Sequence, residues 1–114
     1  VLGVISHKFT RNNNPNRAAA HDLGLASANL SIEATARGLV VHQMIGVEQE
    51  KARQLFSIPA DHELWTALAI GYRADAKTLP EGLRERDLAP RQRKPLSKFV
   101  FSGKWGAAAS LVAK

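Results

Sequence analysis

One stretch of the sequence, NPNRAAAHDLGLASANLSIEATARG at residues 14–38, predicts the helix around which the fold is built. Asn14 is suited to cap the first turn through its side-chain oxygen, and Pro15 fits the first helical position because no N–H is needed there. Gly38 follows the last helical position, where glycine takes a left-handed conformation at little cost. We therefore expect a helix over residues 15–37.

The side chains of this stretch are small or apolar on nearly every side, which is unusual for a surface helix. Two rows at helical spacing run along it. One comprises Leu23, Ala26, Leu30, Ala34 and Arg37, and the other comprises Leu25, Ala28, Ile32 and Ala36. A chain of 114 residues forms one small domain that buries roughly two thirds of its unfolded surface, which leaves few elements to cover such a helix. We expect the missing contacts to come from a second copy of the chain and from sequence removed before Val1.

Composition limits the classes of function. Apolar residues make up 45% and charged residues 23%, which is typical of a globular protein and argues against disorder. The absence of cysteine excludes disulfides, thiolate chemistry and cysteine-based metal sites, and the four histidines are too widely spaced to predict a metal site. No apolar run reaches the roughly 20 residues that span a bilayer, and no signal peptide opens the chain. We expect a cytoplasmic protein.

Hydrophobic patterning predicts an alternation of strands and helices. Strand, helix, strand, helix and strand are expected at residues 1–9, 15–37, 39–46, 47–56 and 63–72. The last strand is apolar throughout, which predicts cover on both faces, and His42 is expected as a hydrogen-bonded core residue. A long connection follows at residues 73–90, with a helical turn at residues 81–87, and a tail at residues 91–114. This order predicts a three-layer α+β arrangement.

The net charge of +6 is concentrated late in the chain. From Arg84 to Lys98 there are six basic side chains against two acidic ones, which favours a phosphate in a nucleic acid or in a cofactor, or else a solvated loop. In an extended segment Arg91 and Arg93 point to the same side, so both guanidinium groups can reach one phosphate. Lys94 would point away.

Four pieces of the sequence, taken in order, resemble the C-terminal part of the FMN-dependent nitroreductase family. They are residues 14–46, EQEKARQLFSIPAD at 48–61, LAIGY at 68–72 and PRQRKPLSKFVFSGKWG at 90–106. The resemblance implies a three-layer, nitroreductase-like α+β fold, with residues 1–114 forming the C-terminal portion of a single domain. It also implies an intertwined homodimer with the helix 15–37 at its centre, and an FMN in each of two clefts between the subunits.

The resemblance also implies two sets of cofactor-binding residues. The turn Gln43-Met44-Ile45-Gly46 would lie along the flavin ring, with a backbone N–H donating near N5 and O4, and Arg91 and Arg93 would bind the 5′-phosphate. Glycine at 46 suits this role because a side chain would keep the backbone from the ring. No catalytic side chain is assigned, since flavin N5 carries the hydride. The family's other FMN-binding residues would precede Val1.

The function implied is NAD(P)H-dependent flavin oxidoreduction by ping-pong hydride transfer to nitroaromatic or quinone-type acceptors. We expect the 114 residues alone to bind FMN weakly or not at all. Two alternatives remain open from the residues: a basic nucleic-acid-binding module that uses Arg84 to Lys98, and a non-enzymatic remnant that dimerises through the helix. Because no base-stacking aromatic residues are interleaved with the basic segment, a phosphate held by two arginines explains its charge better than nucleic acid does.

Overall fold

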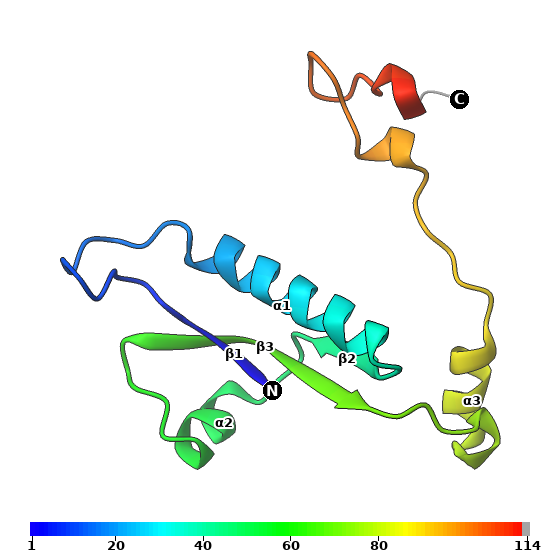
Figure 1. Cartoon of the computed structure of the whole chain (residues 1–114), viewed down its shortest axis with the longest axis horizontal. Coiled ribbons are helices and arrows are strands. Elements are labelled where there is room, and N and C mark those ends of the chain that lie inside the picture. The colour runs from blue at the N-terminus through cyan, green and yellow to red at the C-terminus, as the bar shows by residue number, and fades with distance from the viewer. Residues whose placement is uncertain (113–114) are drawn as a thin grey trace. The chain divides into compact units, whose positions relative to one another are not determined.

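The computed structural model describes residues 1–112, and the chain divides into two compact units, Val1–Ala74 and Asp75–Lys114. The first unit contains five elements, namely β1 (Leu2–Ser6), α1 (Ala19–Ala36), β2 (Val40–Met44), α2 (Gln49–Leu55) and β3 (His62–Gly71). The strands form one sheet in the order β1-β3-β2, and both outer strands are antiparallel to β3 (Figure 1). Since β1 and β2 run the same way on either side of β3, the unit is a split β-α-β arrangement.

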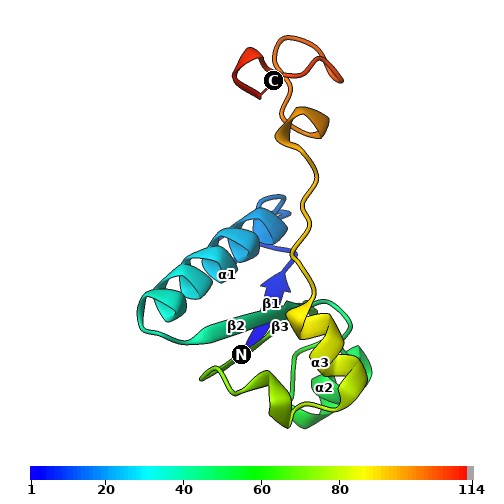
Figure 2. The ribbon, with the colours of Figure 1, turned by 90° about the vertical axis from the view of Figure 1, so that its right-hand side faces the viewer.

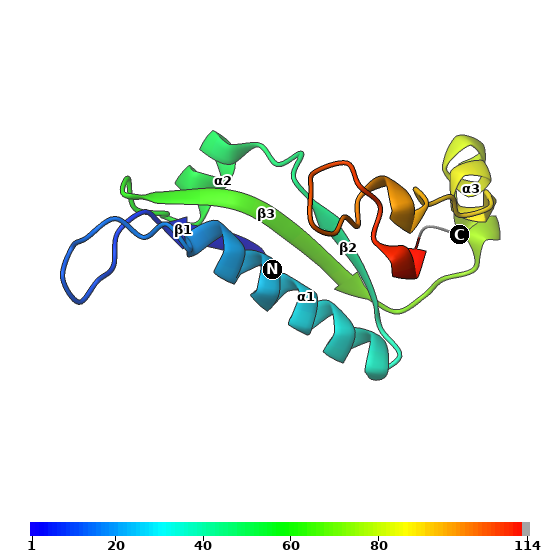
Figure 3. The ribbon, with the colours of Figure 1, turned by 90° about the horizontal axis from the view of Figure 1, so that it is seen from above.

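The sheet of the first unit has a helix on each face. α1 runs lengthwise along one face and contacts both β1 and β2, while α2 lies on the opposite face (Figures 2 and 3). Leu64 and Leu68 of β3 are almost completely buried, at 2% and 4% exposure. The rest of the apolar core comprises Ile5, Ala19, Ala34 and Ala52. The three layers and their order are those predicted.

A β-bulge lies at the centre of the sheet, where β3 contributes one residue more than β1. Gly3 pairs with Thr66 and Val4 with Leu64, which leaves Trp65 unpaired. A Cβ atom on Gly3 would lie 2.5 Å from Thr66 Cγ2 and 2.8 Å from Leu23 Cδ1. Glycine at this position therefore allows α1 and the bulge to approach each other closely.

The start of α1 differs from the sequence prediction. The helix begins at Ala19 rather than Pro15, and no side chain caps it. Pro15 instead forms an isolated bridge with Lys8, and the Asn14 carbonyl oxygen accepts a hydrogen bond from the Phe9 N–H at 2.8 Å. Pairing with the end of the first strand thus holds this segment extended, and the prediction that Asn14 caps the helix is wrong.

The end of α1 confirms the prediction. Gly38 has φ +76, the Gly38 N–H donates to the Thr35 carbonyl at 3.0 Å, and the Leu39 N–H donates to the Ala34 carbonyl at 2.9 Å. These two hydrogen bonds form the Schellman motif that glycine at C′ favours.

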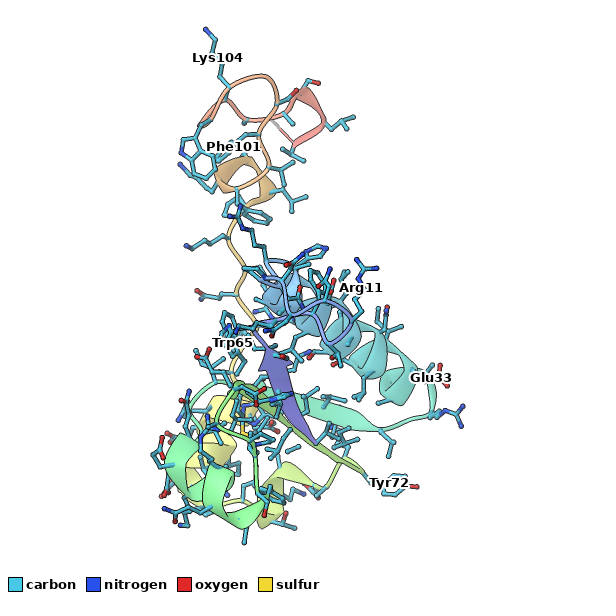
Figure 4. The ribbon with its side chains drawn as sticks, turned by 90° about the vertical axis from the view of Figure 1, so that its left-hand side faces the viewer. Arg11, Glu33, Trp65, Tyr72, Phe101 and Lys104 are labelled. Carbon is cyan, nitrogen blue, oxygen red and sulfur yellow. The ribbon has the colours of Figure 1, made fainter. Side chains whose placement is uncertain are left out.

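Burial of β3 is less complete than its composition predicts. Trp65 is 44% exposed and Tyr72 is 85% exposed and projects from the end of β3 (Figure 4). His42 on the edge strand β2 is also exposed, and its side chain forms no hydrogen bond within residues 1–112, so its predicted core role is wrong. The physical reason in the case of His42 is that it alternates with Gln43, which contacts α1, and so faces the side of the sheet that the seven-residue helix α2 covers only in part.

The second unit consists of short elements. A 3₁₀ turn at Ala76–Thr78 precedes α3 (Glu81–Leu88), close to the predicted helical turn, and further 3₁₀ turns lie at Leu96–Lys98 and Ser110–Val112. Phe101 packs edge-on against Trp105 with ring centroids 5.1 Å apart. The last two residues of the predicted tail lie outside the described residues. That residues 1–114 belong to a single domain stays a prediction. No helix in residues 1–112 has the length and hydropathy required to cross a bilayer.

Candidate functional site

The candidate site begins at the turn of residues 43–46, named here the 43–46 turn, where the edge strand β2 ends. Gln43 and Met44 are the last residues of β2 and pair with Leu68 and Ala67 of β3. Ile45 is 87% exposed, and its carbonyl oxygen accepts a hydrogen bond from the Val47 N–H at 2.9 Å. The chain therefore leaves the sheet in a tight turn whose backbone is open to solvent.

Side chains on both sides of the turn hold it in place. Thr66 Oγ1 donates a hydrogen bond to the Met44 carbonyl oxygen at 2.8 Å. Gln43 Nε2 donates to Ser31 Oγ at 2.8 Å, and Ser31 Oγ donates to the Ser27 carbonyl of α1 at 2.8 Å. The start of the turn is thus hydrogen-bonded both to β3 and to α1.

Two backbone donors of the turn are without acceptors in the described part of the chain. The N–H groups of Ile45 and Gly46 donate no hydrogen bond to residues 1–112. Gly46 does not have a positive φ, and a Cβ added there would meet no atom within 4 Å. Neither the backbone conformation nor the packing of this unit requires glycine at 46, so the open space beside it is available to a ligand.

The turn separates two hollows on opposite sides of the sheet. On the α1 side, Gln43 and Ile45 line a hollow of about 150 Å³ together with Trp65 and Thr66 of the bulge. On the α2 side, Met44 and Gly46 line a hollow of about 320 Å³. Its remaining lining includes Leu2, Val47, Ala52, Leu55, Phe56 and Ala67. Free N–H groups beside mostly apolar walls suit a flat, polar-edged ring system.

Arg91 and Arg93, the predicted phosphate-binding pair, lie in the second unit. Both side chains are exposed in the extended segment between α3 and the 3₁₀ turn at Leu96–Lys98. Arg93 Nη1 donates to the neighbouring Gln92 carbonyl at 2.9 Å, and Arg91 forms no hydrogen bond or salt bridge with residues 1–112. These guanidinium groups are free to bind an anion. They belong to a different unit from the 43–46 turn.

A second cluster of polar residues lies where β1 ends and β3 begins. His7, Asp61 and His62 are among the residues that line a hollow of about 430 Å³ there. His7 Nε2 lies 2.9 Å from Glu63 Oε2, and His62 Nδ1 lies 2.8 Å from Asp61 Oδ1. The hydrogen bond to His62 holds the pKa of the Asp61 carboxyl below its ordinary value. No group of three histidine, aspartate or glutamate side chains within residues 1–112 is arranged to hold a metal ion.

Sequence reasoning missed the two hydroxyl residues that anchor the turn, Ser31 and Thr66. The available signal was a hydroxyl residue within an otherwise apolar strand, ELWTALAIGY at residues 63–72. A part-buried hydroxyl in a sheet favours a nearby acceptor, but only the register of β2 on β3 identifies that acceptor as the Met44 carbonyl.

Known proteins provide an independent test of the fold. No protein-family model matches the chain. A curated relative from Mycolicibacterium smegmatis, described as an uncharacterized 15.4 kDa protein in the ask 5′ region, is 40% identical over 90 residues, which cover 79% of this chain and 60% of the relative. The chain thus spans less than two thirds of the length of the curated relative that it matches.

Two solved structures share the fold. One, described as the crystal structure of an oxidoreductase containing FMN, has a TM-score of 0.83 and 25% identity, and the match covers 93% of this chain and 55% of that one. A nitroreductase family protein from Streptococcus pneumoniae TIGR4 has a TM-score of 0.56 and 19% identity, with 74% of this chain and 36% of that one covered. The nitroreductase-like α+β fold class is therefore confirmed.

Proposed function

We propose that this chain is part of a flavin oxidoreductase that binds FMN along the 43–46 turn. The observation that carries the proposal is the pair of backbone N–H groups at Ile45 and Gly46, which have no acceptor among residues 1–112 and lie beside an open glycine. The structural likeness to an oxidoreductase containing FMN, at 25% identity and a TM-score of 0.83, supports the choice of cofactor.

The residues present fit a flavin ring. The N–H groups of the turn would donate to the polar edge of the ring at N5 and O4, and the absence of a side chain at Gly46 would let the ring approach the backbone. The mostly apolar hollows on either side of the turn would offer the ring apolar contact surface. FMN, when bound, supplies the hydride chemistry, and this chain supplies position and electrostatics.

Phosphate binding is assigned to Arg91 and Arg93. Their exposed guanidinium groups are free of acidic partners among residues 1–112, and two arginines can each offer paired N–H donors to a phosphate dianion. We assign the electron donor as NADH or NADPH and the acceptor as a nitroaromatic or quinone-type compound. The donor and the acceptor would react in turn at the flavin, in the ping-pong scheme that the family resemblance implies. We propose that the protein acts in the cytoplasm.

The assembly proposed is a homodimer through α1. One row of this helix remains exposed in the single chain, with Leu25 at 52% and Ile32 at 68% exposure, together with Ala28 and Ala36. Burying such a row against a second copy would remove apolar surface from water, which stabilises the dimer by roughly 25 cal/mol per Å².

Light scattering over a range of concentrations should give the mass of a dimer, and the I32K substitution should shift that mass toward the monomer. The control E33K, on the adjacent polar row, should not.

Flavin binding tests the proposed function directly. The chain should be purified both alone and with the sequence that its gene encodes on either side. We expect the longer protein to carry FMN at one per subunit, visible as a flavin absorbance band, and to oxidise NADH or NADPH when an acceptor is added. The 114 residues alone should bind FMN weakly or not at all. A longer protein that neither retains nor rebinds FMN would refute the proposal.

A further inference from the structure

Thr66 occupies a constrained position in the bulge of β3. Its methyl group packs over Gly3, so closely that a Cβ at that position would lie 2.5 Å from Thr66 Cγ2. Its hydroxyl donates to the Met44 carbonyl oxygen at 2.8 Å. A β-branched side chain has few rotamers, and here packing on one side and a hydrogen bond on the other select a single one.

The contact between Thr66 and Met44 also determines the direction of the next N–H along the chain. Met44 pairs with Ala67 on β3, and Thr66 belongs to the same strand, so the Met44 carbonyl faces β3. In a planar trans peptide the C=O and the following N–H point in opposite directions. Because β2 is an edge strand, the Ile45 N–H must point outward from the sheet.

We infer that Thr66 is a positioning residue, which holds the Met44–Ile45 peptide so that the Ile45 N–H is aimed as a donor at the bound flavin ring. The inference rests on the proposed function and goes beyond it, because Thr66 would act through the Met44 carbonyl without touching the cofactor. A donor held in place before binding loses little freedom when the ligand arrives, and this increases affinity. Gly3 contributes by leaving room for the Thr66 methyl group.

Two substitutions separate the hydroxyl group from the shape of the side chain. T66V keeps the branched shape and removes the donor, whereas T66S keeps the donor and removes the methyl group. T78V is the matched control, because Thr78 Oγ1 also donates to a backbone carbonyl, that of Asp75 at 2.7 Å, in the second unit. All variants are made in the form of the protein that binds FMN.

Two measurements give the outcome: FMN affinity by fluorescence quenching, and the midpoint potential of bound FMN at saturation. Loss of one aligned hydrogen bond predicts that T66V binds FMN about tenfold more weakly. Its midpoint potential should also shift, because an N–H donor at the ring edge interacts differently with oxidised flavin, whose N5 accepts a hydrogen bond, and with reduced flavin, whose N5 carries a hydrogen. T66S and T78V should stay within about twofold of the unsubstituted protein in affinity and keep its potential.

The possible results distinguish this inference from the proposed function. If T66V has the affinity and potential of the unsubstituted protein, or if T66S loses as much as T66V, the positioning role is overturned while the proposed function stands. If the unsubstituted protein binds no FMN, both are overturned. Reduced thermal stability of T66V would not prevent the test of the positioning role. The midpoint potential is measured only on the folded protein with FMN bound.

Discussion

Arginine is used differently in the two units of this protein. In the first unit, Arg53 of α2 donates three hydrogen bonds to backbone carbonyls, those of Ile58 at 3.2 Å, Pro59 at 2.6 Å and His62 at 2.8 Å. It thereby closes the loop between α2 and β3. In the second unit, Arg93 bonds only to the neighbouring Gln92 carbonyl and Arg91 to no described residue. A guanidinium group whose donors are used by the fold is structural, and one whose donors are free is available to a ligand.

The two predicted cofactor-binding elements differ in the same way. The 43–46 turn is held by Thr66 and by the Gln43–Ser31 hydrogen bond before any ligand binds. Arg91 and Arg93 are long exposed side chains, and ordering each of them on binding costs roughly 1 kcal/mol of entropy. We therefore expect the turn to determine the geometry of the ring and the arginines to contribute mainly charge.

The largest effect is expected from removing the free guanidinium groups. The double variant R91A/R93A should bind FMN at least about 100-fold more weakly, because two charge-assisted contacts to phosphate are lost. Its thermal unfolding without FMN should be unchanged. FMN affinity is measured by fluorescence titration, and thermal unfolding without FMN is measured by calorimetry. K94A is the control in both experiments. Loss of oligonucleotide binding with FMN binding intact would favour the nucleic-acid alternative instead.

A smaller effect is expected from removing the structural guanidinium group. R53M should lower the free energy of unfolding by about 2 kcal/mol, since three backbone carbonyls lose a charged donor. K51M is the matched control on the same helix. Lys51 makes only an exposed contact with Glu48 at 3.5 Å, so its loss should cost less than about 0.5 kcal/mol. Chemical denaturation followed by circular dichroism gives the free energy of unfolding of both variants. If R53M and K51M lose the same free energy of unfolding, Arg53 has no special structural role.

Gly3 tests how closely α1 and the bulge are packed. G3A should destabilise the protein by about 1 kcal/mol, because the added methyl group overlaps Thr66 Cγ2 and Leu23 Cδ1. G71A is the control in the same sheet, at a glycine where a Cβ meets no atom within 4 Å, and should cause no loss. Thermal melts of the two variants give the result. A G3A protein as stable as G71A would show that the bulge can relax.

The smallest effect concerns the exposed pair Asp61 and His62. Because the folded-state pKa of Asp61 lies below its ordinary value of 3.8, its contribution to stability is complete above pH 3.8. That contribution is lost as the pH falls through the lower folded-state pKa. A carboxyl carbon titration by NMR should give a midpoint below 3.8, and H62Q should raise it toward that value. An unchanged midpoint in H62Q would show that His62 is not the cause.

Sequence reasoning located most elements because their patterns are local. Gly38 ends α1 as predicted, and α3 begins at Glu81 as predicted. The start of α1 was missed because Pro15 is also compatible with an extended segment, and its bridge to Lys8 depends on a contact between two parts of the chain. The members of the 43–46 turn were named from a family resemblance, and their cofactor role stays a prediction.

What the sequence determined by itself is the order of the elements, the alternation that makes three layers, and the glycine that ends α1. These follow from steric and hydrophobic preferences that act within a few residues. Only the tertiary structure decided that Thr66 faces the Met44 carbonyl, that Arg53 is occupied while Arg91 is free, and that Gly3 lies against the bulge. The contacts of Thr66 and Gly3 depend on strand register, because a shift of one residue in pairing would turn each residue to the other face of the sheet. The difference between Arg53 and Arg91 depends on which backbone carbonyls the fold brings within reach of each side chain.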